Sequence, residues 1–300
     1  MRNFILLALA GAGAQLVDGA LGMAYGVSST TLLLLVGVAP ALASAAVHIA
    51  EVGTTAVSGI SHASFGNVDW SKIVWLAIPG GIGGFLGATA LVYASTLEAT
   101  AGLVEPIVAI FLFCLGVYIL SRFAFRRQER PVEVRPIGRK FLTPLGFVAG
   151  FLDAMGGGGW GPISTPTLLS SGRMEPRKII GTVDTSEFVV ALCASLGFLF
   201  SLSFAEVPWT VVGAVLVGGV VAAPLAAYIV RLLPMRLLGT AVGGVILVTN
   251  MKTFFEAIGV SGGAATVAYV LIVGVWVAAL ASAIAAIRRD RALGTESQPA

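Results

Sequence analysis

Two glycine-rich stretches decide the fold of this chain: DGALGMAYGVSSTT at residues 18–31 and DAMGGGGWGPISTP at residues 153–166. They align at an offset of 135 residues, so that Asp18 meets Asp153 and Tyr25 meets Trp160. Besides the two aspartates, the identical pairs are Gly22 with Gly157, Gly26 with Gly161, Ser29 with Ser164 and Thr30 with Thr165. Because polar residues and glycines carry the match, rather than the common alanines, the pattern indicates an internal repeat.

The repeat continues beyond these stretches once one residue is inserted. Pro40 then meets Pro176, and the segment HIAE at residues 48–51 meets DTSE at residues 184–187. Each of these two segments begins and ends on ionisable residues spaced i and i+3, which share one face of a helix. The two halves of the chain therefore place polar groups at equivalent positions.

The composition places the chain in a membrane. Of its 300 residues, 57% are hydrophobic and 11% are charged, with a net charge of +3, and the mean hydropathy is +0.95. Soluble domains carry about 25% charged residues, and disordered chains combine low hydrophobicity with high charge, so both classes are excluded. The apolar runs are continuous and do not alternate as in an outer-membrane barrel, which indicates bundled membrane helices.

Signatures of catalysis and of metal or nucleic-acid binding are missing from the sequence. Cys114 and Cys193 lie in apolar runs without the spacing of a metal site. The two histidines, His48 and His62, do not form an H-E-x-x-H pattern, and no phosphate-binding loop occurs. The sequence therefore predicts no cofactor, no metal, no nucleic-acid partner and no enzymatic activity.

Nine apolar segments are candidate membrane elements, because a spanning helix needs about 20 apolar residues. They lie at residues 3–36, 41–61, 72–94, 98–121, 141–171, 179–204, 208–231, 236–257 and 263–287. The first and the fifth are long and are interrupted by the glycine-rich stretches. The extended polar stretch at 122–140 contains seven basic residues, and the positive-inside rule puts it in the cytoplasm.

The positions of the basic residues distinguish two topologies. If 141–171 crossed the membrane once, eight of them would be misplaced, namely Arg173, Arg177, Lys178, Arg231, Arg236, Arg288, Arg289 and Arg291. If 3–36 and 141–171 each form a re-entrant hairpin, 16 of the 18 basic residues are cytoplasmic, with Arg2 and Lys252 as exceptions. The hairpin topology predicts an extracytoplasmic N-terminus and a cytoplasmic C-terminus. A cleavable signal peptide at residues 1–14 is the alternative, and its removal would destroy half of the first hairpin.

Each half then contains one broken-helix hairpin and three membrane-spanning helices. Three crossings per half turn the second half upside down, so we predict an all-α integral membrane protein built as an inverted repeat, with one extra C-terminal transmembrane helix. The predicted units are 1–121 (first repeat), 122–140 (basic cytoplasmic linker), 141–257 (second repeat), 258–287 (extra helix) and 288–300 (cytoplasmic tail).

The paired D-x-x-x-G-x-x-[YW]-G elements, together with the basic central loop, resemble the TauE/SafE family of sulfite and organosulfonate exporters. The resemblance covers roughly residues 5–257. It implies a multi-pass protein of the cell inner membrane that exports a small anion, either sulfite or a C2 sulfonate, without a cofactor. The residues alone indicate only an inverted-repeat secondary transporter.

A substrate site is expected where the two interrupted helices meet near the membrane midplane. After each break a helix restarts with hydroxyl-bearing residues, and helix N-termini attract anions. The candidate substrate-binding residues are Tyr25, Gly26, Ser28, Ser29, Thr30, Thr31, Trp160, Gly161, Ile163, Ser164, Thr165 and Lys252. Helix capping and small-residue packing are alternative roles for the hydroxyls, interface packing is the alternative for the aromatic residues, and Lys252 could instead pair with Glu105 or extend to the interface.

Ionisable residues inside a membrane are functional candidates because burying them is costly. The candidates for proton coupling, or for holding the broken backbone in shape, are Asp18, His48, Glu51, Asp153, Asp184 and Glu187. Alternating access of two inverted repeats is the predicted mechanism, with the lipid bilayer, a small anion, a coupling proton and a second copy of the chain as candidate partners. The alternatives are proton-coupled uptake of another anion and an intramembrane enzyme that uses Asp18 and Asp153 as a carboxylate pair.

Overall fold

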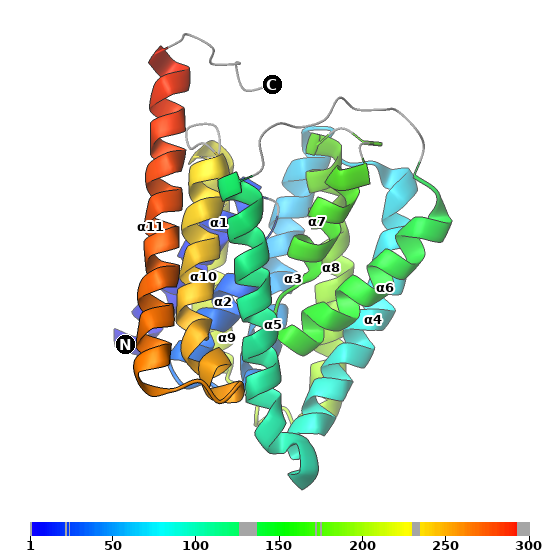
Figure 1. Cartoon of the computed structure of the whole chain (residues 1–300). Coiled ribbons are helices and arrows are strands. Elements are labelled where there is room, and N and C mark those ends of the chain that lie inside the picture. The colour runs from blue at the N-terminus through cyan, green and yellow to red at the C-terminus, as the bar shows by residue number, and fades with distance from the viewer. Residues whose placement is uncertain are drawn as a thin grey trace.

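The computed structural model describes residues 2–21, 23, 25–125, 137–171, 173–174, 176–229 and 235–292. These residues form helices and no strand (Figure 1). The helices are α1 (Arg2–Leu21), α2 (Tyr25–Leu35), α3 (Pro40–Ser64), α4 (Trp70–Thr96), α5 (Glu98–Phe125), α6 (Arg139–Gly156), α7 (Trp160–Ser171), α8 (Pro176–Ser201), α9 (Trp209–Ile229), α10 (Met235–Ala257) and α11 (Gly262–Ala292). Most of the basic linker, at 126–136, and the end of the tail, at 293–300, lie outside the described residues.

Both predicted helix interruptions are present. The first separates α1 from α2, and the second separates α6 from α7. Gly157 (φ 70°) ends α6 in the left-handed conformation, and Gly158 follows with φ 143°, a backbone conformation that glycine alone adopts without strain. In Figure 1, α6 runs from the upper right to the middle of the molecule and α7 returns toward the upper end. The glycine-rich stretch therefore reverses the chain within the bundle.

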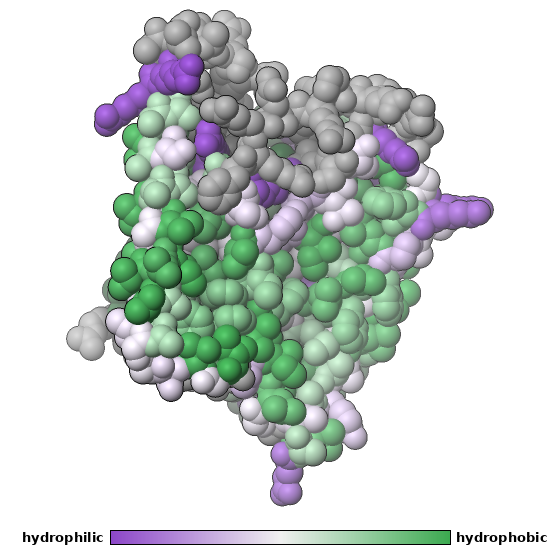
Figure 2. Space-filling view, viewed as in Figure 1, coloured by the Kyte–Doolittle hydropathy of each residue, from purple (hydrophilic) through white to green (hydrophobic). Residues whose placement is uncertain are grey.

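Several helices have the length and composition of membrane spans. Among the described residues, five helices are long and apolar enough to cross a bilayer: Pro40–Ser64, Trp70–Thr96, Glu98–Ala124, Lys178–Ser201 and Gly262–Arg289. Shorter apolar helical stretches lie at Phe4–Asp18, Tyr25–Leu35, Trp209–Ala223 and Gly239–Val248. The face of the molecule in Figure 2 is predominantly hydrophobic over the middle of the bundle and more polar toward its ends. The arrangement is that of a multi-pass membrane protein.

Helices of the first half pack closely on helices of the second half through glycines. α4 lies against α6, where a Cβ on Gly146 would meet the backbone of Leu76. α1 lies against α9, where a Cβ on Gly11 would meet the backbone of Val215 at 2.5 Å. Small residues allow such close approach of membrane helices. The broken helices of each half are therefore held by the other half.

α3 and α8 form the centre of the bundle and run antiparallel. Near the start of α3 the His48 ring lies 5.8 Å from the Phe198 ring at the end of α8, whereas near the end of α3 Gly59 contacts Thr185 in the first part of α8. α5 packs on α10. The additional helix α11 lies on the outside of α10 (Figure 1).

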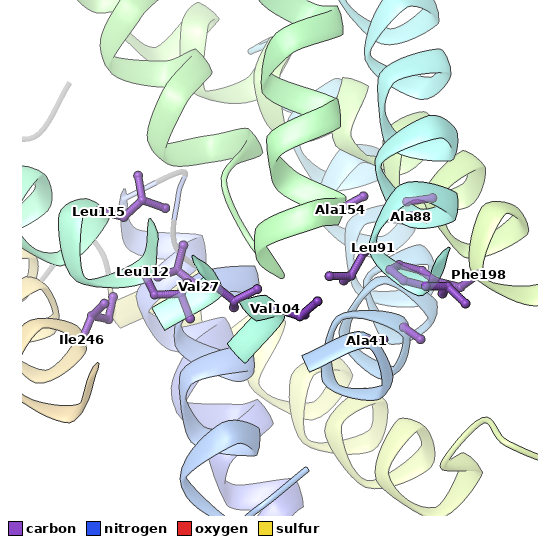
Figure 3. Packing of buried hydrophobic residues seen from close by; sticks show 14 of the residues in the cluster. Val27, Ala41, Ala88, Leu91, Val104, Leu112, Leu115, Ala154, Phe198 and Ile246 are labelled. Carbon is purple, nitrogen blue, oxygen red and sulfur yellow. The ribbon is translucent and has the colours of Figure 1, made fainter. Parts of the chain in front are cut away.

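The main hydrophobic cluster joins the two breaks. Val27, directly after the first break, and Ala154, directly before the second, belong to the same buried cluster as Leu91 of α4, Leu112 of α5 and Phe198 of α8 (Figure 3). Burial of these apolar side chains holds the two interruptions side by side. The fold thus positions both glycine-rich stretches, and the polar residues beside them, in the interior.

Candidate functional site

An aspartate caps the helix that follows each break. Oδ1 of Asp153 accepts hydrogen bonds from the backbone N–H groups of Gly159 (2.7 Å) and Trp160 (2.9 Å) at the start of α7. Oδ1 of Asp18 accepts one from the N–H of Tyr25 (3.3 Å) at the start of α2. Carboxylates at helix N-termini satisfy unpaired N–H groups and interact favourably with the helix dipole. Each aspartate therefore connects the helix before its break to the first residues of the helix after it.

Asp153 also joins the two halves of the chain through His48. Nδ1 of His48 lies 2.8 Å from the backbone oxygen of Ser44, which can only accept, so we assign a hydrogen to Nδ1. Nε2 lies 3.1 Å from Oδ2 of Asp153. Because Oδ1 of this aspartate already accepts two N–H groups, the arrangement fits an imidazolium paired with a carboxylate. The pair is fully buried.

The carboxylate of Glu51 lies beside this pair. Its Oε2 is 4.0 Å from Nε2 of His48, as the shared helix face predicts, and its residue exposure is 1%. Neither carboxylate oxygen has a hydrogen-bond partner among the described residues, and a Cβ on Gly26 would approach Oε1 to 3.1 Å. We call His48, Glu51 and Asp153 the histidine cluster.

A second cluster contains the residues that the alignment of the two halves relates to the first, Asp18, Asp184 and Glu187. One carboxylate oxygen from each of Asp18, Asp184 and Glu187 can be chosen so that the three lie within 4.8 Å of one another. We call these residues the acidic cluster. Ser58 donates a hydrogen bond to Oδ1 of Asp184 (3.1 Å), and Nε2 of His62 lies 4.0 Å from Oδ2, which is beyond hydrogen-bond distance.

The two clusters are equivalent by alignment and reciprocal in space. Asp153, His48 and Glu51 are aligned with Asp18, Asp184 and Glu187. In each cluster the aspartate comes from a helix before a break, and the i, i+3 pair comes from the long helix of the opposite half. Glu51 of the histidine cluster lies beside Gly26, whose neighbour Tyr25 donates its backbone N–H to Asp18 of the acidic cluster, so the two clusters form one polar centre between the breaks.

Five of the six predicted hydroxyl residues are buried near the starts of α2 and α7, namely Ser29, Thr30, Thr31, Ser164 and Thr165. Thr30 donates a hydrogen bond to the backbone oxygen of Gly157 in the opposite break. The buried hydroxyls of Ser29 and Ser164 have no hydrogen-bond partner among the described residues. Thr165 is fully buried. Two of the hydroxyl residues, Ser28 and Thr31, line an apolar cavity of about 280 Å³ between α1, α2 and α10.

The aromatic residues beside the breaks pack on glycines of the opposite half. The Trp160 ring lies against Gly80 of α4, and the Tyr25 ring lies against Gly219 of α9. Nε1 of Trp160 donates to the backbone oxygen of Val183 (3.0 Å). Both rings therefore pack at the interface between the two halves. A role as cavity walls stays a prediction.

Some predicted site residues are placed without a visible polar contact to the centre. Gly161 is buried and Ile163 is partly buried in the first turn of α7. Lys252 lies on α10 and Glu105 on α5, but their side chains lie outside the described part of the chain. Their predicted pairing therefore stays a prediction.

Three polar residues that sequence reasoning missed support the site. Ser44 binds the His48 ring through its carbonyl and donates its hydroxyl to the backbone oxygen of Ala154 (2.8 Å). Ser58 binds Asp184. Asn250 donates to Oγ1 of Thr31 (3.1 Å). Ser44 precedes His48 by four residues, and Ser58 follows Glu51 by seven, so helical spacing is a signal that could find these two residues. The contact of Asn250 with Thr31 joins residues far apart in the sequence and has no such signal.

Comparison with known proteins agrees with a membrane transport function. Residues 7–253 match the family described as Sulfite exporter TauE/SafE. The chain is 46% identical over 283 residues, covering 93% of its own length and 92% of the relative, to the Probable membrane transporter protein YtnM of Bacillus subtilis (strain 168). No solved structure matches the chain. With the match extending over both breaks and both polar clusters, the chain belongs to the TauE/SafE sulfite exporter family of membrane transporters.

Proposed function

We propose that this chain is a secondary transporter that exports a small sulfur oxyanion, either sulfite or a C2 sulfonate, from the cytoplasm by alternating access of two inverted repeats. The observation that carries the proposal is the polar centre between the two breaks, to which each half contributes one capping aspartate and one i, i+3 pair. Inverted-repeat transporters bind substrate and coupling ions where their interrupted helices meet.

The packing supports the inverted relationship. The contact of Gly146 with Leu76 is equivalent to the contact of Gly11 with Val215. The two glycines are 135 residues apart, which is the offset of the repeat. Leu76 and Val215 are also equivalent, because each follows an aligned tryptophan, Trp70 or Trp209, by six residues. The rings of Trp160 and Tyr25 lie on glycines that the same alignment relates. Exchange of the two halves therefore preserves the main contacts, and such pairs of equivalent interfaces allow one half to rock against the other.

The buried hydroxyl groups near the starts of α2 and α7 support an oxyanion as substrate. Ser29 and Ser164 provide buried donors without partners among the described residues, and a sulfite or sulfonate group offers three oxygens that accept hydrogen bonds. Asp153 already occupies the first N–H groups of α7. These N–H groups are therefore not free for an anion. We assign the hydroxyl groups of Ser29 and Ser164 as the donors to the substrate.

The acidic character of the centre supports coupling to protons or another cation. Its two clusters together contain five carboxyl groups and His48. An anion near ionised carboxylates is repelled unless a cation neutralises them. Export itself is favourable for an anion when the cell interior is negative, by about 2.3 kcal/mol per charge for each 100 mV. The same centre favours proton-coupled uptake of another small anion as a second candidate.

The proposal places the protein in the cell inner membrane with the basic linker and the C-terminus in the cytoplasm. The support is the positive-inside distribution of its basic residues. Labelling an engineered cysteine near the N-terminus with an impermeant reagent from outside the cell tests this orientation. Protection of that cysteine in intact cells would overturn the hairpin topology.

The experiment that tests the function is anion flux in proteoliposomes. We expect saturable efflux of sulfite or sulfoacetate that responds to an imposed voltage, and loss of affinity in Ser29→Ala and Ser164→Ala. Ser121→Ala is the matched control, because that hydroxyl is exposed and bonds only its own helix. Absence of saturable flux under any voltage or pH gradient would contradict transport, and flux that runs only inward with protons would replace export by uptake.

A further inference from the structure

We propose that the acidic cluster, Asp18, Asp184 and Glu187, is a binding site for a hard, oxygen-preferring metal cation such as Na⁺ or Ca²⁺. The binding site itself does not depend on the proposed export, whereas its use as a coupling-ion site rests on that function. The proposal is carried by the geometry of the three carboxylates, by an unpaired buried oxygen among them, and by the contrast with the histidine cluster.

The distances suit a cation with oxygen ligands. One oxygen from each of the three carboxylates lies within 4.8 Å of the other two. A cation placed centrally among these three oxygens would lie within about 2.8 Å of each of them. This distance is close to the roughly 2.3–2.6 Å at which carboxylate oxygens bind Ca²⁺. Na⁺ has nearly the same radius as Ca²⁺, whereas Mg²⁺ requires about 2.0–2.1 Å and an octahedral shell.

The charges in this cluster are buried and poorly compensated by the described residues. Asp18, Asp184 and Glu187 are 4%, 3% and 8% exposed. Oδ2 of Asp184 has no hydrogen-bond partner among the described side chains and backbone groups. Nε2 of His62 lies 4.0 Å from this oxygen, which is too far for a hydrogen bond. Unpaired buried carboxylates are costly, so a bound cation would satisfy an acceptor that the protein leaves open.

The histidine cluster indicates where a positive charge belongs. There, Nε2 of His48 lies 3.1 Å from Asp153 and 4.0 Å from Glu51, so the protein supplies its own cation. In the acidic cluster the residue aligned with His48 is Asp184, and a third carboxylate replaces that cation.

The position of each aspartate in its helix adds to this contrast. Asp18 lies in the last turn of α1, as Asp153 lies in the last turn of α6. C-terminal helix ends carry partial negative charge, and discontinuous transporter helices use them to coordinate cations. Both helix ends therefore favour a positive charge, which His48 provides at α6 and which a metal ion would provide at α1.

Direct binding of radiolabelled Na⁺ and Ca²⁺ to the purified full-length protein tests the site, without any sulfur anion present. Potassium is the size control, and an organic cation keeps the ionic strength constant. We expect saturable binding of Na⁺ or Ca²⁺, and a rise in the thermal unfolding midpoint with that metal. Asp18→Asn and Glu187→Gln should lose both effects, whereas Glu206→Gln, which removes an exposed loop carboxylate, should keep them.

The variant Asp184→His tests the site even if the neutral variants fail to fold. It places an imidazole where the other half has His48, so we expect a folded protein that no longer binds the metal and whose unfolding midpoint no longer depends on it. Absence of saturable binding of either metal to the wild-type protein, or binding that Asp184→His leaves unchanged, would overturn the proposal. A dependence of the unfolding midpoint on pH alone would assign the site to a proton and overturn the metal site as well.

Flux measurements separate this inference from the proposed function. If metal binding is present but no anion moves, the metal site stands and the transport proposal fails. If anion flux is saturable and independent of Na⁺ and Ca²⁺, and neither metal binds, export stands and the metal site fails.

Discussion

Nε2 of His48 lies 3.1 Å from Oδ2 of Asp153, and this contact joins α3 of the first half to α6 of the second. The same aspartate caps α7 through its other oxygen. One carboxylate therefore connects the second break to the long central helix of the opposite half. Any movement of one half against the other must keep this contact or replace it.

Removal of the imidazole should destabilise the protein strongly. Because His48→Ala leaves the buried carboxylate of Asp153 without its cation, we expect a loss of about 3–5 kcal/mol, the usual result of removing one partner of a buried ion pair. The thermal unfolding midpoint in detergent measures the effect. His62→Ala is the control, because that ring is partly exposed and its nearest carboxylate oxygen is 4.0 Å away. Equal midpoints for the two variants would contradict the assigned pair.

The two functions of Asp153 can be separated by substitution. Asp153→Asn keeps an oxygen that can accept from the N–H groups of Gly159 and Trp160, and it removes the charge that pairs with His48. Asp153→Ala removes both. We expect the alanine variant to be less stable than the asparagine variant by about 1 kcal/mol, the typical contribution of a helix cap, as measured by thermal unfolding. Identical midpoints would show that the cap contributes nothing.

The sequence was sufficient for the helical architecture and for the position of both breaks. Glycine-rich segments with polar residues are rare in apolar chains, so the repeat that contains Asp18 and Asp153 could be read directly. The pairing of Asp153 with His48 of the opposite half could not be read, because it depends on how α6 docks against α3 and not on spacing along the chain. Local periodicity carries no information on such contacts.

The sequence also predicts the donors at the helix N-termini only in part. It indicates that Asp153 could hold the break and that the N-terminus of α7 attracts an anion, but not that the aspartate itself binds the first N–H groups. In the structure the carboxylate accepts from Gly159 and Trp160, which follow it by six and seven residues. That contact requires the chain to reverse through Gly157 and Gly158, and the reversal depends on backbone angles that the glycine run permits but does not specify.

A side chain at Gly158 should disrupt the contact between the two breaks. Its φ of 143° strains any other residue, and a Cβ there would meet the backbone of Val27 and Gly26 in the first break. We expect Gly158→Ala to cost about 1–3 kcal/mol from backbone strain, with a further loss from the displaced backbone. Gly213→Ala on α9 is the control, since a Cβ there meets nothing within 4 Å. Thermal unfolding and protein yield measure the difference, and a variant as stable as the control would contradict the close approach of the breaks.

An exchange between the two clusters tests whether a positive charge is needed at each helix break. His48→Asp alone creates a second set of three carboxylates, and Asp184→His alone gives both clusters an imidazole. The double variant His48→Asp with Asp184→His preserves the composition of the centre and transfers the cation from one half to the other. If the halves are equivalent, the double variant should be more stable than the sum of the single changes predicts, by a coupling energy of about 0.5–3 kcal/mol.

A complete double-mutant cycle of unfolding midpoints, measured with and without Na⁺ or Ca²⁺, reads out this coupling. The double variant should again bind one metal ion, now at Asp153, Glu51 and the substituted position 48, because that cluster then has the carboxylate set of Asp18, Asp184 and Glu187. Strictly additive single effects would mean that the two clusters do not share one polar centre. Metal binding that stays with Asp18 and Glu187 in the double variant would mean that Asp184 does not decide which half holds the ion.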